Sequence, residues 1–324
     1  MLCILYVTAI GTLLGVAGRL VERVLPATAP RRWVWCVVIA ITMAVPPIYR
    51  TNHATSVTDV VDQQMVQPPS ANPLAATSAP TSQMSWSARI ESYNPIIHRL
   101  WLITSAVLII WGLASAWRVS RILSLSRSGR GNAGGAAIVD DVPVVVTDLV
   151  GPATVGVLRS RVLVPRWVLA LPGAQRRYVL RHEDEHRRAH DARLLFAMSL
   201  PIILTPWNLA LWWQLRRLRL AVEMDCDNRV VSALGDATAY GELLLKVAQA
   251  ASHGPRLQPA LLGVGMLEQR LKLLLAPTPL RHAQRFLLPA LAFALLFVVL
   301  SMPHPVLRHK SDAHVAVTAG TLPK

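Results

Sequence analysis

The chain has 324 residues, of which 53% are hydrophobic and 16% are charged, and its mean hydropathy is +0.40. This composition argues against a soluble one- or two-domain protein and favours a membrane protein. The net charge of +15 would suit a nucleic-acid-binding protein. However, the sequence holds no basic module interleaved with aromatic residues and no DNA-binding helix pattern, so we expect no direct contact with nucleic acid.

Four apolar segments are long enough to cross about 30 Å of hydrocarbon, which takes about 17 to 25 helical residues. These predicted transmembrane helices are residues 2–17, 33–49, 100–117 and 286–302. Tryptophans lie near the ends of the second and third segments, as is typical of residues at a membrane interface. The first segment has no positively charged start and no clear cleavage site, so we expect a retained membrane helix rather than a signal peptide.

Basic residues are distributed unevenly between these segments. Residues 118–285 carry 23 Arg and Lys against 13 Asp and Glu, and residues 19–32 carry 4 against 1, whereas residues 50–99 balance at 3 and 3. The positive-inside rule then keeps the two basic segments in the cytoplasm and exports the neutral one, whose Pro, Ser, Thr and Gln predict disorder. The predicted regions are a membrane region at 1–118 with its exported loop at 50–99, a cytoplasmic domain at 119–285, a fourth span at 286–302 and an exported tail at 303–324.

The stretch RHEDEHRRAHDARL gathers three of the ten histidines of the chain. In a helix, His182 and His186 lie four residues apart and project from one face, about 6 Å apart at their origins. With Glu183 they form H-E-x-x-H, in which two neutral imidazoles bind zinc and the glutamate is the general base. The same letters also fit the inverted motif H-x-x-E-H, with Glu185 as the base. Both interpretations predict one zinc ion per chain and differ in the catalyst.

A hydrolytic zinc site needs a third protein ligand and one open position. Ala192 stands where metzincins have their third histidine, and His190 lies one turn too far along the helix to share one ion easily. The better candidate is Glu223 in a predicted helix, with Asp227 four residues later able to orient a ligand histidine. Ordinary ion pairs with neighbouring arginines remain the alternative for both acids. Cys226 either contacts the metal or packs as a small buried residue.

Two runs rich in β-branched residues, 144–147 and 162–164, precede the metal motif and are separated by a Gly-Pro turn signal. They predict a small β-sheet. An edge strand of this sheet could hold a substrate backbone extended across the zinc, and the alternative is a sheet that only supports the domain.

The apolar run 194–213 separates the two histidines from Glu223. If this run crossed the membrane once, Glu223 would lie on the opposite side from the histidines, so a single crossing cannot build one site. Pro201 and Pro206 also interrupt a straight helix. We therefore expect a helix buried in the domain, a re-entrant hairpin or an interfacial helix.

Several motifs lie together in residues 142–277. They are HEDEH with Asp191 five residues beyond it, Trp207-Asn208, EMDCD at 223–227, Tyr240-Gly241, the Arg- and Leu-rich segment 266–277 and the upstream stretch VPVVVTDLVGPATVGVLRSRVLVP. With these motifs the chain resembles the BlaR/MecR family of bacterial membrane zinc metallopeptidases, which signal β-lactam exposure or related envelope stress. The resemblance implies His182, His186 and Glu223 as zinc ligands and Glu183 as the base, which favours the forward motif over Glu185.

On this basis we predict a mainly α protein of the bacterial inner membrane, multi-pass, with a cytoplasmic gluzincin-like α+β peptidase domain in contact with membrane lipid. Asp191 and Asp227 are expected to orient ligands or helices. Tyr240 either donates to the oxyanion or packs in the core. The resemblance suggests a cytoplasmic transcriptional repressor as the substrate of an antirepressor peptidase, with self-cleavage as a further activity.

The tail 303–324 is too short to fold as a penicillin-binding domain and has no Ser-x-x-Lys nucleophile, so covalent β-lactam sensing by this tail is not expected. The alternative function is a non-catalytic membrane transducer or scaffold in which a metal ion only braces the domain. A transporter is disfavoured because the spans lack embedded acids and repeats.

Overall fold

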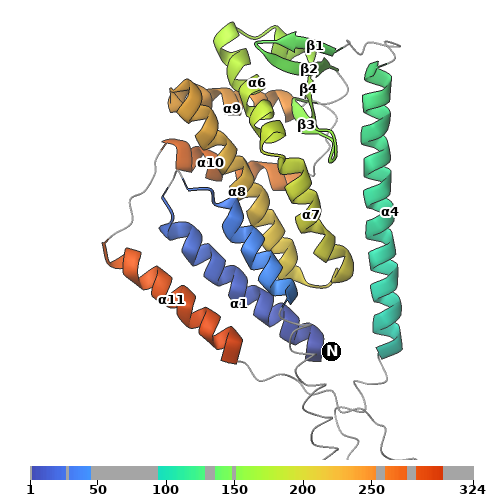
Figure 1. Ribbon diagram of the computed structural model, residues 1–324, viewed down its shortest axis with the longest axis vertical. Coiled ribbons are helices and arrows are strands. Elements are labelled where there is room, and N and C mark those ends of the chain that lie inside the picture. Colours follow the sequence, from blue (N-terminus) through green and yellow to red (C-terminus); the bar gives the residue numbers. More distant parts are fainter. Residues whose placement is uncertain are drawn as a thin grey trace, which may run out of the picture.

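The computed structural model describes residues 2–26, 29–44, 94–127, 136–147, 151–252, 260–275 and 282–301. In chain order its elements are α1 (Leu2–Val24), the helix Arg32–Ala44, α4 (Asn94–Arg127), β1 (Ala136–Val139), β2 (Val142–Val146), β3 (Ala153–Val155), β4 (Arg161–Val164), α5 (Arg166–Leu169), α6 (Gly173–Arg188), α7 (Asp191–Leu204), α8 (Leu209–Leu234), α9 (Ala237–Ser252), α10 (Ala260–Leu275) and α11 (His282–Ser301). The predicted mainly helical fold with a small sheet is confirmed (Figure 1).

The sheet lies at the end of the molecule away from the N-terminus of α1 (Figure 1). Its strand order is β1-β2-β4-β3, with β2 and β4 parallel and the two outer pairs antiparallel. Strand β2 includes residues 144–146 of the first predicted run, β4 contains the second run, and β3 lies at one edge. Asp140 and Asp141 join β1 to β2 with φ values of 48° and 64°, as a tight hairpin turn of the mirror-image type requires.

Helix α6 packs on this sheet through a small hydrophobic core. Val179 and Leu180 of α6 contact valines of β2 and β4, including Val144 and Val162, and the core also includes Leu243 of α9. These side chains are almost completely buried. The apolar face of α6 thus points to the sheet and to α9, which fixes the direction in which its histidines project.

The apolar run between the metal motif and Glu223 forms a helical hairpin. Helices α7 and α8 pack against each other and run in opposite directions (Figure 1). Pro201 lies in the last turn of α7 and Pro206 in the connecting turn, so both prolines contribute to ending α7 instead of kinking one long helix. The side chain of Asn208 then caps α8 by accepting hydrogen bonds from the backbone N–H groups of Ala210 and Leu211. Because the chain returns, the two histidines and Glu223 lie at the same end of the hairpin.

Helices α1, Arg32–Ala44, α7 and α8 share one hydrophobic core. Its buried residues include Leu14, Trp35, Ile202 and Leu218. Two specific contacts bring α8 close to α1: the Gln214 amide donates to the backbone oxygen of Gly11 at 2.7 Å, and Gly15 lies against the ring of Trp213, where a Cβ atom would be 2.2 Å from the ring. The hairpin is therefore built onto the N-terminal helices.

Among the described residues, two helical segments are long and apolar enough to span a membrane, Ile4–Val24 and Pro95–Arg121. The apolar helices Arg32–Ala44 and Gln284–Val299 are shorter, so the predicted four spans are not all shown. Residues 45–49 and 302 of the predicted spans and residues 50–93 of the predicted exported loop lie outside the described part of the chain. Helix α4 begins at Asn94 and ends at Arg127, and α1 ends at Val24. Both helices extend beyond the predicted spans, because each helix continues through polar residues that do not belong to an apolar span.

Candidate active site

The two histidines of the metal motif face each other on α6. The Nε2 atoms of His182 and His186 are 3.2 Å apart, and the rings meet edge to face with centroids 4.7 Å apart. Both side chains are mostly buried, at 12% exposure. His190, by contrast, is exposed at the joint between α6 and α7, where its backbone has a left-handed φ of 54°. The structure thus brings together the two histidines at helical spacing and leaves the third apart from them.

Glu223 of α8 completes a group of three donors. Its Oε2 atom lies 3.6 Å from Nε2 of His182, and its Oε1 atom lies 3.7 Å from Nε2 of His186. In a tetrahedral zinc site with bonds of about 2.0 to 2.1 Å, neighbouring donor atoms are about 3.4 Å apart. The three observed separations bracket this value, so these side chains fit a zinc ion in both chemistry and spacing.

Cys226 lies on the other side of His182. Its Sγ atom is 3.4 Å from Nδ1 of His182, and His182, His186 and Cys226 form a group whose candidate ligand atoms lie within 4.8 Å of one another. A His-His-Cys set is therefore a geometric alternative to the set with Glu223. We favour Glu223, because its carboxylate oxygens approach the same two Nε2 atoms that face each other, whereas the thiol lies beside the opposite nitrogen of the His182 ring.

The second nitrogen of His186 is held by a buried carboxylate. Nδ1 of His186 lies 2.8 Å from Oδ2 of Asp191, which is only 2% exposed. The other oxygen of this carboxylate accepts a hydrogen bond from Nη1 of Arg32 at 2.5 Å. A carboxylate on the second ring nitrogen fixes the tautomer and the orientation of a histidine ligand. With Nδ1 protonated, the lone pair of Nε2 points toward His182 and Glu223.

The second nitrogen of His182 is held through a tyrosine. The hydroxyl of Tyr240 lies 2.9 Å from Nδ1 of His182 and donates to Oδ1 of Asp227 at 2.7 Å. Since its proton goes to Asp227, the hydroxyl accepts from Nδ1–H of His182 and directs the lone pair of Nε2 toward Glu223. The guanidinium of Arg270 donates to both oxygens of Asp227 at 2.7 Å.

Tyr240 is 1% exposed, and its ring packs near that of Tyr178. Of the two roles that the sequence left open, this placement agrees with packing in the core, and a position behind His182 suits the orientation of a ligand better than an oxyanion contact.

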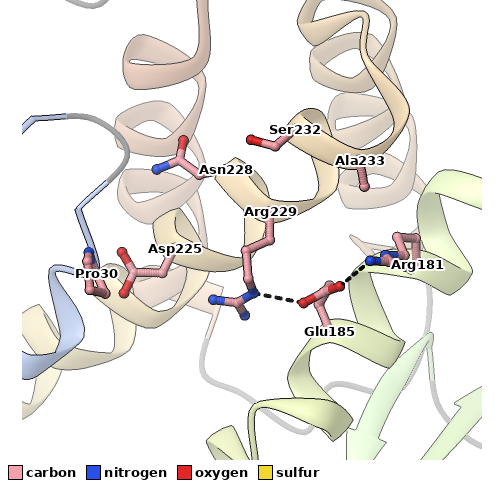
Figure 2. Close-up of a pocket in the computed structure, with 8 residues that line it drawn as sticks. All are labelled: Pro30, Arg181, Glu185, Asp225, Asn228, Arg229, Ser232 and Ala233. Carbon is pink, nitrogen blue, oxygen red and sulfur yellow. Dashed lines mark hydrogen bonds and ion pairs between the residues drawn. The ribbon is translucent and has the colours of Figure 1, made fainter.

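The two glutamates of the motif lie in different surroundings. Glu183 is 8% exposed, and the hydroxyl of Thr154 in edge strand β3 lies 2.6 Å from its backbone oxygen and 3.0 Å from its Oε2 atom, so the two oxygens share one donor. Glu185 instead makes ion pairs with Arg181 at 2.7 Å and with Arg229 at 2.8 Å. Figure 2 shows these pairs among the residues that line a cleft between α6 and α8. The volume of this cleft is about 480 Å³. The carboxylate of Glu185 is already engaged by two guanidinium groups, whereas that of Glu183 contacts a neutral hydroxyl, so the geometry favours Glu183 as the base.

Arg270 of α10 also touches a candidate ligand directly. Its Nη1 atom is 3.0 Å from Oε2 of Glu223. Burial raises the pKa of Glu223, whereas the guanidinium of Arg270 and, when they are protonated, the two histidines lower it, and together they hold this pKa well below its ordinary range. The carboxylate is therefore ionised across the physiological range, as a metal ligand must be.

Sequence reasoning missed Thr154, Arg32 and Arg270. The Arg- and Leu-rich segment 266–277 pointed toward Arg270 without naming it. Nothing in the spacing of the sequence singles out Arg32, which precedes its partner Asp191 by 159 residues.

Comparison with known proteins adds one positive result. No curated protein and no solved structure matches the chain. The family model described as BlaR1 peptidase M56 matches residues 1–274, which confirms the resemblance inferred from the motifs. Because the matched residues make up most of the chain, it belongs to the BlaR1 peptidase M56 family, a family of membrane-associated metallopeptidases of signal transduction.

Proposed function

We propose that this protein is an integral-membrane zinc endopeptidase, with His182, His186 and Glu223 as ligands of one zinc ion and Glu183 as the general base. The observation that carries the proposal is the approach of two imidazole nitrogens and one carboxylate, from two separate helices, to between 3.2 and 3.7 Å of one another. A helix-surface ion pair would not require both histidines to aim the same nitrogen at one point.

The chemistry then divides between the ion and the protein. A bound zinc ion supplies Lewis-acid chemistry, which polarises a peptide carbonyl and makes water a better nucleophile at neutral pH. Glu183 takes the proton of the attacking water on its carboxylate and delivers it to the leaving amine. Thr154 holds Oε2 of this carboxylate, which restricts the directions from which the glutamate can reach the proton.

Edge strand β3 supports binding of an extended substrate. It is the outer neighbour of β4, and its Thr154 contacts Glu183. A peptide that added to this edge as a further strand would pass beside the base, with its backbone held by main-chain hydrogen bonds. Such binding selects extended, unstructured segments of a protein.

The placement in the membrane follows from α1 and α4 and from the distribution of charge. In this proposal α1 and α4, which are long and apolar enough to span a membrane, cross it together with the shorter helix Arg32–Ala44 and α11. The arginine-rich peptidase part of this multi-pass protein of the bacterial inner membrane then faces the cytoplasm. The contact of Arg32 with Asp191 supports this sidedness, because it puts the site at the basic end of the N-terminal helices. The proposed substrate is a cytoplasmic repressor-like regulatory protein, and the chain also cleaves itself.

The test uses full-length wild type, Glu183→Gln and Glu185→Gln, each purified in detergent. We expect one zinc per chain in all three proteins, because none of the substitutions removes a ligand. Cleavage of a library of unstructured peptides and of candidate repressors is expected in wild type and Glu185→Gln, and not in Glu183→Gln.

Retained cleavage in Glu183→Gln with loss in Glu185→Gln would reverse the assignment of the base. Zinc bound tightly by a wild-type protein that cleaves neither the peptide library nor itself would favour the non-catalytic transducer.

A further inference from the structure

The start of the helix Arg32–Ala44 is buried against the metal site. Arg32 is 6% exposed, and the two carboxylates that it contacts, Asp191 and Asp225, are 2% and 4% exposed. Burying an arginine with two carboxylates removes three charged groups from water, and close contacts must offset this cost of desolvation. The contacts of Arg32 should therefore be specific.

Asp225 of α8 fixes the end of this helix. Its two oxygens accept hydrogen bonds from the backbone N–H groups of Arg31 at 3.0 Å and Arg32 at 3.1 Å, which are donors that a helix N-terminus leaves unpaired. The Nε atom of Arg32 donates to the same carboxylate at 3.0 Å. The first turn of the helix is thus attached to α8, two residues beyond Glu223.

The guanidinium of Arg32 also contacts Asp191, the carboxylate that holds His186. Nη1 of Arg32 contacts Oδ1 of Asp191 at 2.5 Å, and Oδ2 of Asp191 lies 2.8 Å from Nδ1 of His186. A continuous series of contacts therefore runs from the helix Arg32–Ala44 through Arg32 and Asp191 to the ring of His186. Arg229 is the other cation near Asp191, but its Nη2 atom is 3.9 Å away, too far for a hydrogen bond.

We propose that Arg32 is a positioning residue for His186 and that, through it, the position of the helix Arg32–Ala44 controls how tightly the site holds its metal ion. The proposal rests on the proposed zinc site. The planar guanidinium bridges two carboxylates that belong to α7 and α8, as a single ammonium group cannot do with the same geometry. If this helix shifts along its axis, Arg32 pulls Asp191 away from Nδ1 of His186 and the ring loses its orientation.

This role differs from simple support of the fold. A residue that only stabilises packing would lower the melting temperature when replaced, yet the folded protein would bind zinc as before. A positioning residue changes the affinity for the ion and the coordination geometry of the folded protein. Loss of an outer partner of a histidine ligand typically lowers metal affinity by about 10- to 100-fold.

The experiment compares full-length wild type, Arg32→Gln, Arg32→Lys, Asp191→Asn and the double variant Arg32→Gln/Asp191→Asn in lipid nanodiscs. Zinc affinity is measured by competition with a chelator, the coordination geometry by the visible absorption of bound Co²⁺, and folding by thermal unfolding of the metal-free proteins. The matched control is Arg217→Gln, which removes another buried arginine whose guanidinium pairs with Glu22 of α1 and not with a carboxylate that holds a histidine.

We expect zinc affinity to fall by about 10- to 100-fold in Arg32→Gln, with a changed Co²⁺ spectrum, and by less in Arg32→Lys. The control should keep the wild-type affinity and spectrum. The double variant should bind zinc no more weakly than Asp191→Asn alone, because both substitutions break the same series of contacts.

A zinc affinity of Arg32→Gln within twofold of the wild type, or losses that add fully in the double variant, would overturn the proposal and leave the zinc peptidase in place. If Arg32→Gln does not fold, Arg32→Lys with a wild-type affinity and Co²⁺ spectrum overturns it equally. A wild-type protein that binds neither zinc nor Co²⁺ would overturn the proposed function and this inference together.

Discussion

The two candidate ligand histidines are held by different parts of the molecule. His186 contacts Asp191 directly at 2.8 Å, and the arginine behind that carboxylate comes from the N-terminal region. His182 contacts Tyr240 at 2.9 Å, and its carboxylate Asp227 lies at 3.5 Å with an arginine from α10 behind it. The orientation of His186 therefore depends on a single carboxylate, that of Asp191. His182 has the hydroxyl of Tyr240 and the carboxylate of Asp227, and each can partly replace the other.

The arginines differ as well. Arg270 contacts both Asp227 and the candidate ligand Glu223, so it organises two donors within the peptidase region. Arg32 contacts Asp191 and the carboxylate that caps its own helix, so it organises one donor and attaches an N-terminal apolar helix to it. A movement of the N-terminal helices would therefore affect His186 more directly than His182.

The largest expected effect comes from the residue that both sides share. Glu223→Ala removes the third donor and leaves only the two histidines. Two imidazoles alone do not make a complete zinc site, so we expect the zinc content of the purified protein to fall from one ion per chain to near zero. Metal analysis of the purified protein measures this loss.

Cys226→Ser is the matched comparison, one turn further along α8, and it should retain zinc. Loss of zinc in Cys226→Ser with retention in Glu223→Ala would show that the thiol, not the carboxylate, is the third ligand.

Local spacing made part of this site predictable. His182, Glu183 and His186 lie within five residues of α6, so the periodicity of one helix determines which side chains share a face. Asp191 begins the next helix, α7, and only its short distance in the sequence from His186 could be used. Glu223 and Asp227 could be grouped in the same way on their own helix, although the resemblance was needed to bring the two helices together. The β-branched runs likewise predicted β2 and β4. In contrast, β1 begins with two alanines and β3 has only three residues, so neither gives a clear pattern.

The arginines could not be predicted, because their contacts depend on tertiary structure. The chain has 33 Arg and Lys, and charge complementarity does not say which of them meets a given aspartate. Arg32 and Arg270 are brought to the site by the packing of the N-terminal helices and of α10 on α8. A hairpin was one of three alternatives for residues 194–213. The chain reverses at residues 205–208, and Pro201 and Pro206 predicted a break there without predicting the direction in which the chain continues.

The second prediction compares the two carboxylates. Asp191→Asn leaves His186 without a charged partner, so we expect zinc affinity to fall by about 10- to 100-fold, toward the upper end of that range. Asp227→Asn should lie toward the lower end, because Tyr240 still contacts Nδ1 of His182. Chelator competition on the two purified proteins measures both losses. An equal or larger loss in Asp227→Asn would mean that the tyrosine does not carry the orientation of His182.

The smallest expected effect concerns the tyrosine itself. Tyr240→Phe removes the hydroxyl between His182 and Asp227, a neutral hydrogen-bonding group worth about 1 kcal/mol, and Asp227 at 3.5 Å can move toward the ring. We therefore expect a loss of zinc affinity of less than about tenfold, with peptide cleavage at saturating zinc close to the wild type. An oxyanion donor would behave in the opposite way, since its removal lowers kcat by about 100- to 1,000-fold and leaves metal binding unchanged. Measuring both quantities on one preparation separates the two roles, and a large loss of kcat at full zinc occupancy would return Tyr240 to the oxyanion role that the sequence suggested.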